Sequence, residues 1–167
     1  MDHLWSPWRL PYVTGTGRDP GCVFCDAQEG DEGASLILLH GRVCFIILNK
    51  YPYNNGHLMV VPNRHLGSLR DAADDELAEL MQLTRLSELA LTEAYEPHGL
   101  NMGINIGKPA GAGVLDHVHL HVVPRWNGDT NYMTVVGQTR VLPEELAATA
   151  ARLRPIFRRL HHGGATE

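Results

Sequence analysis

Three histidines with apolar neighbours stand close together late in the chain. His117, His119 and His121 are two residues apart, and the residues between and directly after them are apolar. In a strand, side chains two residues apart share one face, so the spacing predicts a strand over His117–Val123 with a row of imidazoles opposite an apolar face. Neutral imidazole binds metal ions and attacks electrophiles, so the row suits either metal binding or nucleophilic attack.

Two cysteines near the start of the chain form a second candidate site. Cys22 and Cys25 have the spacing at which two thiolates grip one tetrahedral metal ion, although a redox pair or two core thiols would show the same pattern. Cys44 lies inside an apolar run and is predicted to be a core thiol. With three cysteines in all, no disulfide framework is expected, and a reducing cytoplasm is the predicted location.

A glycine-rich segment, Gly103–Gly113, leads into the histidines. It is not a phosphate-binding Walker A loop, because Met102 stands at the first glycine position and Pro109 at the Ser/Thr position. The backbone N–H groups of Gly111 and Gly113 are candidates for an anion-binding nest. The alternative is that these glycines only permit a tight turn.

The elements that must position these residues follow from hydrophobic periodicity. A hairpin is predicted over 35–48, a buried strand over His57–Pro62, and a long helix over Asp71–Tyr95 with a capping box beginning at Ser68. Further strands are predicted over Leu100–Ile106 and over the histidine row, and an extended segment over 132–142. Pro143 opens a final helix with an interruption expected at Pro155. This order predicts an α+β fold: an antiparallel sheet of about five strands with one long helix and a C-terminal helix.

Composition limits the classes of function. The chain has 167 residues, 44% hydrophobic and 20% charged, and a formal charge of −5, which suits one compact domain and argues against nucleic-acid binding. No secretion signal or membrane-spanning run is seen. We expect an N-terminal arm over 1–20, a main domain over 21–142, and a C-terminal helix and tail over 143–167.

The histidine row carries a family resemblance. Positions 117–123 read His-Val-His-Leu-His-Val-Val and match the pattern of the histidine triad (HIT) superfamily. Positions 48–62 resemble its nucleotide-binding strand-loop-strand. Positions 124–131 resemble the branch that contains bacterial diadenosine tetraphosphate phosphorylases. The similarity covers roughly residues 20 to 143 in the family's order, and it implies the HIT-like fold.

The resemblance implies roles for individual residues. His119 would attack the α-phosphate and carry a nucleotidyl intermediate, with a backbone carbonyl on the glycine-rich side holding its second ring nitrogen. His121 would contact the phosphate or the leaving group, and His57 would support this network. Asn49 would contact the ribose. Gly111 and Gly113 would bind phosphate through their backbone, because the Gln, Ser or Thr of many HIT hydrolases is missing here.

The resemblance also implies a structural zinc ion and no organic cofactor. Several HIT and uridylyltransferase-like proteins complete a cysteine pair with two histidines, which here correspond to His65 and His117. The implied ligand set is Cys22, Cys25, His65 and His117. A closed set of four suits a structural ion. Four basic residues are further candidates for phosphate contacts, with solvated surface as the alternative: Lys50, Lys108, Arg125 and Arg140.

The implied ligand is a purine nucleotide or dinucleoside polyphosphate, with diadenosine tetraphosphate favoured. Inorganic phosphate as acceptor would give phosphorolysis, and water would give hydrolysis. Two alternatives stay open: a hydrolase of diadenosine polyphosphates or AMP phosphoramidate, and a zinc-stabilised nucleotide-binding module without turnover. A homodimer or higher homo-oligomer is implied, and neither nucleic acid nor a membrane is an expected partner.

Overall fold

The computed structural model describes residues 21–30, 36–130 and 144–163. In chain order the elements are α2 (Val23–Glu29), β1 (Ile37–His40), β2 (Cys44–Leu48), β3 (Leu58–Pro62), the 3-10 turn η2 (Leu69–Asp71), α3 (Asp74–Tyr95), β4 (Gly99–Ile104), the 3-10 turn η3 (Lys108–Ala110), β5 (Leu120–Arg125) and α5 (Leu146–Gly163). The expected arm over 1–20, the extended segment over 132–142 and the end of the predicted tail lie outside the described residues.

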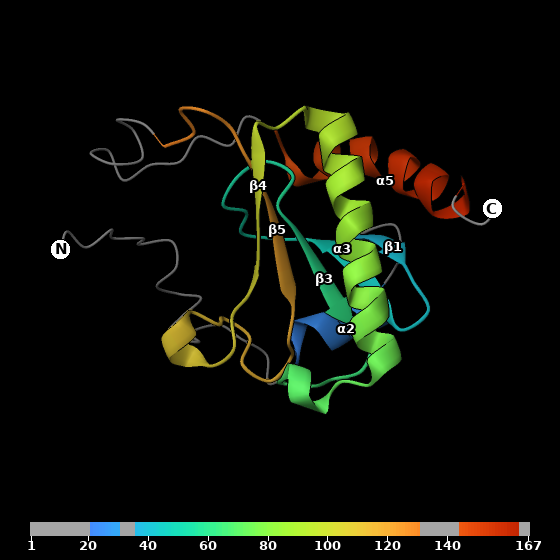
Figure 1. The fold of residues 1–167 in the computed structure, drawn as a ribbon, viewed down its shortest axis with the longest axis vertical. Helices are drawn as coiled ribbons and strands as arrows, with labels where there is room; N and C mark the ends of the chain where they lie inside the picture. The colour runs from blue at the N-terminus through green and yellow to red at the C-terminus, as the bar shows by residue number, and fades with distance from the viewer. Residues whose placement is uncertain (1–20, 31–35, 131–143, 164–167) are drawn as a thin grey trace.

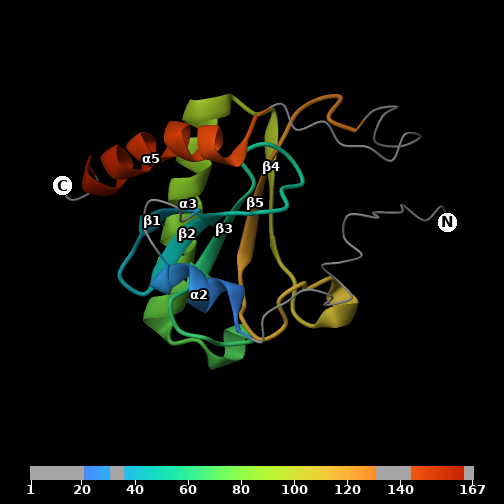
Figure 2. The same cartoon turned by 180° about the vertical axis from the view of Figure 1, so that it is seen from behind.

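The strands form one sheet in the order β1-β2-β3-β5-β4, and every neighbouring pair is antiparallel. Helices α3 and α5 cover one face of the sheet, and the short α2 lies against the other (Figures 1 and 2). The predicted α+β fold with an antiparallel sheet of about five strands is therefore confirmed.

A core fills the space on each side of the sheet. Leu58 of β3 and Val122 of β5 belong to one core with Leu91 of α3 and Phe157 of α5. The opposite core is smaller and is built from Phe24 of α2 and apolar residues of the first three strands. Because β2 and β3 are covered on both faces, all of their residues are buried, which explains why their sequences read as continuous apolar runs.

Two predicted helix features are wrong. The long helix begins at Asp74, where Glu76 accepts a hydrogen bond from the backbone N–H of Ala73 (2.8 Å), whereas Ser68 makes no capping bond. Helix α5 also continues through Pro155 without interruption. A proline removes one helical hydrogen bond, but the fully buried Leu153 and Phe157 on either side anchor the helix to the core.

The strand that carries the histidines starts later than predicted. β5 begins at Leu120, so His117 and His119 precede the ladder. The intervening Val118 donates its backbone N–H to the carbonyl of Leu66 (2.7 Å), in the loop that follows β3. Residues 117–120 are all buried, and the rings of His117 and His119 both lie against Phe24 of α2, with ring centroids 5.3 and 4.9 Å from it. These two imidazoles therefore lie on the same side although the strand ladder has not yet begun.

Candidate active site and metal centre

The four predicted metal ligands come together in space. Cys22 precedes α2 and Cys25 lies in its first turn, while His65 follows β3 and His117 precedes β5. One ligand atom from each lies within 4.8 Å of the other three. The Nδ1 atom of His117 is 3.2 Å from the Sγ atom of Cys22 and 3.7 Å from that of Cys25, which is 3.4 Å from Nδ1 of His65.

This donor set fits a tetrahedral zinc ion. Zinc–sulfur and zinc–nitrogen bonds of about 2.0–2.3 Å place ligand atoms roughly 3.6 Å apart, close to the separations seen here. Nε2 of His117 lies 2.9 Å from the carbonyl oxygen of Pro62. That contact assigns the proton to Nε2. The lone pair is then on Nδ1, which faces the thiols, as a metal-binding histidine requires.

His119 is held by the main chain of its neighbour. Its Nδ1–H donates to the carbonyl of His117 (2.9 Å), so the lone pair is on Nε2. The prediction that a carbonyl on the glycine-rich side accepts this hydrogen bond is therefore wrong, because the chain bends at His117 and presents the His117 carbonyl instead. Burial lowers the pKa of His119, so a neutral ring with a nucleophilic nitrogen is favoured.

His57 and His121 form a second, directional pair. The backbone N–H of Tyr53 donates to Nδ1 of His57 (3.1 Å), which leaves the His57 proton on Nε2. Nε2 of His57 is 3.0 Å from Nδ1 of His121, so His57 donates and His121 accepts. A neutral His121 then carries its own proton on Nε2, as a proton donor to a departing oxygen must. The ring of His121 is 4.8 Å from that of His119.

The predicted substrate residues lie at different positions around these rings. The side-chain nitrogen of Asn49 is 3.5 Å from Nε2 of His57, and its oxygen accepts the backbone N–H of Tyr51. Gly111 has a φ of +91°, and a Cβ there would stand 4.0 Å from the side-chain nitrogen of Asn105. Gly113 is half-buried in the bend that follows. The structure thus puts Asn49 beside the imidazoles and Gly111 beside Asn105.

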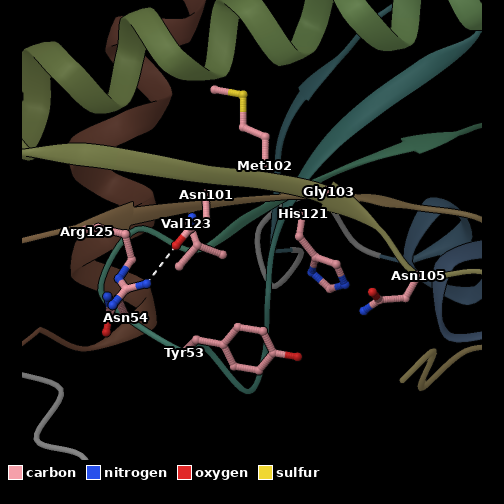
Figure 3. A pocket seen from close by; sticks show the side chains of 9 residues that line it. All are labelled: Tyr53, Asn54, Asn101, Met102, Gly103, Asn105, His121, Val123 and Arg125. Atoms are coloured by element: carbon pink, nitrogen blue, oxygen red, sulfur yellow. Dashed lines mark hydrogen bonds between the residues drawn. The ribbon is translucent and has the colours of Figure 1, made fainter. Parts of the chain in front are cut away.

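A pocket of about 280 Å³ opens next to His121, between β4 and the loop around Tyr53. In Figure 3 the amide of Asn105 points toward the ring of His121, and the ring of Tyr53 lies below it. Sequence reasoning missed Asn105 and Tyr53. Asn105 could have been found as the polar residue directly after a strand that borders the histidine strand.

Arg125 at the far end of this pocket is not a free cation. Its guanidinium makes two hydrogen bonds to Asp129 (2.6 and 2.8 Å) and one to the side-chain oxygen of Asn101 (2.7 Å), the last of which is drawn in Figure 3. The same arginine lowers the pKa of Asp129. Of the other basic candidates, Lys50 and Lys108 do not line the pocket, and Arg140 lies outside the described residues.

The sheet, the imidazoles and the cysteine-histidine cluster together define a histidine-triad protein. A family model described as HIT domain matches residues 31–128. The chain is also 37% identical over 157 residues to the AP-4-A phosphorylase of Mycobacterium tuberculosis, across 89% of this chain and 80% of that protein. The chain belongs to the HIT domain family, and the expected membership of an enzyme family is thereby confirmed.

Solved structures agree with this assignment. A Zn-bound histidine triad family protein from Mycobacterium smegmatis is 28% identical with a TM-score of 0.69, over 85% of this chain and 96% of that one. A hypothetical histidine triad nucleotide-binding protein from Sulfolobus tokodaii is 29% identical with a TM-score of 0.67, over 83% and 93%. The zinc bound by the M. smegmatis protein is compatible with the four-ligand cluster described above.

Proposed function

We propose that this HIT-family protein transfers a nucleotidyl group from a dinucleoside polyphosphate, with diadenosine tetraphosphate as the favoured substrate. The observation that carries the proposal is the hydrogen bond from Nδ1–H of His119 to the carbonyl of His117, which directs the lone pair to Nε2. His121 lies next to it with its proton assigned to Nε2 by His57. A nucleophile and a proton donor therefore stand side by side.

The proposed reaction has two displacements at the α-phosphorus. In the first, Nε2 of His119 forms a bond to phosphorus while the bond to the bridging oxygen breaks, and the proton on Nε2 of His121 passes to that oxygen. In the second, an acceptor oxygen bonds to phosphorus while the phosphorus–nitrogen bond breaks, and His121 takes the acceptor's proton. The second step reverses the bond changes and the proton transfer of the first, so the same two histidines serve both steps.

Phosphate is the favoured acceptor, and water is the alternative. The name of the M. tuberculosis relative, a phosphorylase, supports phosphate, as does the similarity of the segment after β5 to the phosphorylase branch. Asn49 is proposed to hold the ribose. Asn105 and the backbone around Gly111 and Gly113 are proposed to hold the transferred phosphate.

A product assay tests the proposal. Diadenosine tetraphosphate is incubated with the purified protein, with and without inorganic phosphate, and the nucleotides are separated. We expect ADP and ATP in equal amounts and a rate that depends on phosphate. AMP and ATP would instead identify a hydrolase, and release of AMP from AMP phosphoramidate alone would favour the phosphoramidate alternative. Nucleotide binding without any product would contradict the enzyme proposal.

The remaining features belong to the same proposal. Cys22, Cys25, His65 and His117 would hold one structural zinc ion, which ties α2 and the loop after β3 to the segment that carries His119. A homo-oligomer and the division into an arm over 1–20, a HIT domain over 21–142 and a C-terminal part over 143–167 are also proposed. None of the described helices is both long enough and apolar enough to span a bilayer.

A further inference from the structure

Gly103 stands directly across the sheet from His121. The two residues are paired in the β4–β5 ladder, and both line the pocket. A Cβ added to Gly103 would meet no atom of the described chain within 4 Å. Its φ is not positive, so neither the backbone conformation nor a close neighbour requires glycine here. A glycine inside a strand weakens the strand, and it often marks a place where a ligand approaches.

The chemistry of the pocket suits a phosphate chain. No carboxylate is present among the nine described residues that line it, and the amides of Asn101 and Asn105 and the guanidinium of Arg125 border the space. The amide nitrogen of Asn54, which also lines it, already donates to the carbonyl of Pro124 and to Asp129. Arg125 lies four residues beyond His121 on β5, about 13 Å along the strand. Its charge is shared with Asp129, so this end offers oriented polar groups without a strong net charge.

In-line displacement determines which side of the phosphorus each group occupies. The nucleophile and the leaving oxygen lie on opposite sides, so the acceptor that later displaces His119 must approach from the side on which the leaving group departed. The pocket is lined by His121, the proposed proton donor to that group, and not by His119. The departing and the incoming phosphates would therefore share one site.

We propose that this pocket receives the polyphosphate portion that leaves the substrate, and afterwards the inorganic phosphate that replaces it, and that Gly103 keeps the pocket open. This inference rests on the proposed function. An oxygen of the bound phosphate attacks the phosphorus, the bond to Nε2 of His119 breaks, and the proton of the phosphate passes to His121. The nucleoside half of the substrate lies outside this pocket.

A series of side chains at Gly103 tests the inference. Gly103→Ala, Gly103→Val and Gly103→Leu fill the pocket step by step. Gly99→Leu is the matched control, since Gly99 is on the same strand, has equally open space at its Cβ, and does not line the pocket. For each variant we measure kcat/KM for diadenosine tetraphosphate, the KM for inorganic phosphate, and the inhibition constant of AMP, which represents the transferred half alone.

Along the series we expect kcat/KM for diadenosine tetraphosphate to fall and the KM for phosphate to rise, each at least tenfold at leucine. The AMP constant should stay within threefold, and Gly99→Leu should leave all three values within threefold. Melting temperature and oligomeric state are recorded for every variant. If Gly103→Leu does not fold, the inference is judged from Gly103→Ala and Gly103→Val. Unchanged substrate and phosphate constants in folded variants, or an equal loss of AMP binding, would overturn the inference. A wild-type protein without any nucleotidyl-His119 intermediate would instead refute the proposed function itself.

Discussion

The four buried or half-buried histidines of the site, His57, His117, His119 and His121, differ in which ring nitrogen carries the proton. One carbonyl accepts Nε2–H of His117 and another accepts Nδ1–H of His119, so the lone pairs of these two rings are on different nitrogens. The backbone N–H of Tyr53 fixes His57, and His57 in turn fixes His121. The main chain therefore decides which imidazole can bind metal, attack phosphorus or donate a proton.

Replacing His119 separates binding from turnover. His119→Ala should keep nucleotide binding and lose turnover by at least about 1,000-fold, because no other lone pair takes its position. Calorimetry measures binding, and a radiolabelled substrate measures the protein-bound intermediate. His98→Ala is the control, since His98 accepts a hydrogen bond from Asn127 away from the pocket. Turnover or labelling that survives in His119→Ala would contradict the assigned nucleophile.

His57 should act by positioning the proton of His121. His57→Phe retains most of the buried volume but removes the donor to Nδ1 of His121, so kcat should fall by about 10–100-fold with little change in KM. His57→Gln, which keeps an N–H donor, should recover part of kcat. The loss should be larger for poor leaving groups than for good ones. Equal losses for all leaving groups would point to a packing defect instead.

At the scale of elements, sequence periodicity predicted the described strands and the helices α3 and α5, but it missed α2 and some of the element ends. The apolar runs of β2 and β3 and the leucine spacing of α3 are local patterns, so these elements could be predicted from the sequence. The start of β5 could not, because Val118 pairs with Leu66, a partner distant in sequence. The carbonyl that holds His119 was missed for the same reason, since its direction depends on that bend.

The cysteine-histidine cluster should bind metal as purified. We expect about one zinc per chain by elemental analysis of protein prepared without chelators. Cys25→Ala should lose the metal and lower the melting temperature, because the ion joins three separate segments. Cys44→Ala is the control, because this buried thiol lies outside the cluster. Metal-free wild-type protein would rule out the site.

The loop after β5 depends on one carboxylate. Asp129 accepts hydrogen bonds from Arg125 and from the side chain of Asn54. Asp129→Asn should lower the free energy of unfolding by about 1 kcal/mol, a modest figure because the side chain of Arg125 is 43% exposed.

The effect should depend on pH in a defined direction. The pKa of Asp129 is lowered in the folded protein, so its stabilisation is present above about pH 4, the ordinary value, and is lost as the pH falls further. Urea unfolding at pH 7 and pH 3 measures this. A difference between wild type and Asp129→Asn that is as large at pH 3 as at pH 7 would contradict the assignment.

At the scale of the whole molecule, the candidate site combines residues from Cys22 to Arg125. The sequence predicted the members of the metal cluster because a family resemblance supplied the pairing of Cys22 and Cys25 with His65 and His117. The pocket was not predicted, since it is defined by the space beside Gly103, and empty space leaves no pattern in a sequence.

The oligomeric state is testable through β4, one of the two edge strands of the described sheet. Within the described residues β4 pairs only with β5, and Met102 on it is 42% exposed. An edge of this kind favours pairing with a second copy. We expect a dimer or larger assembly by light scattering, and we expect Met102→Lys to shift it toward monomer, with Met81→Lys on α3 as the control for an exposed methionine. A monomeric wild type would contradict the prediction.

Strand β4 is both an edge strand of the described sheet and one wall of the pocket beside His121. A second chain laid along that edge would therefore form the outer boundary of the pocket. Activity per mole of protein would then rise with protein concentration and level off once assembly is complete, instead of staying constant. Dilution of the protein would then lower its activity, and rates measured at nanomolar enzyme would understate the rate of the assembled form.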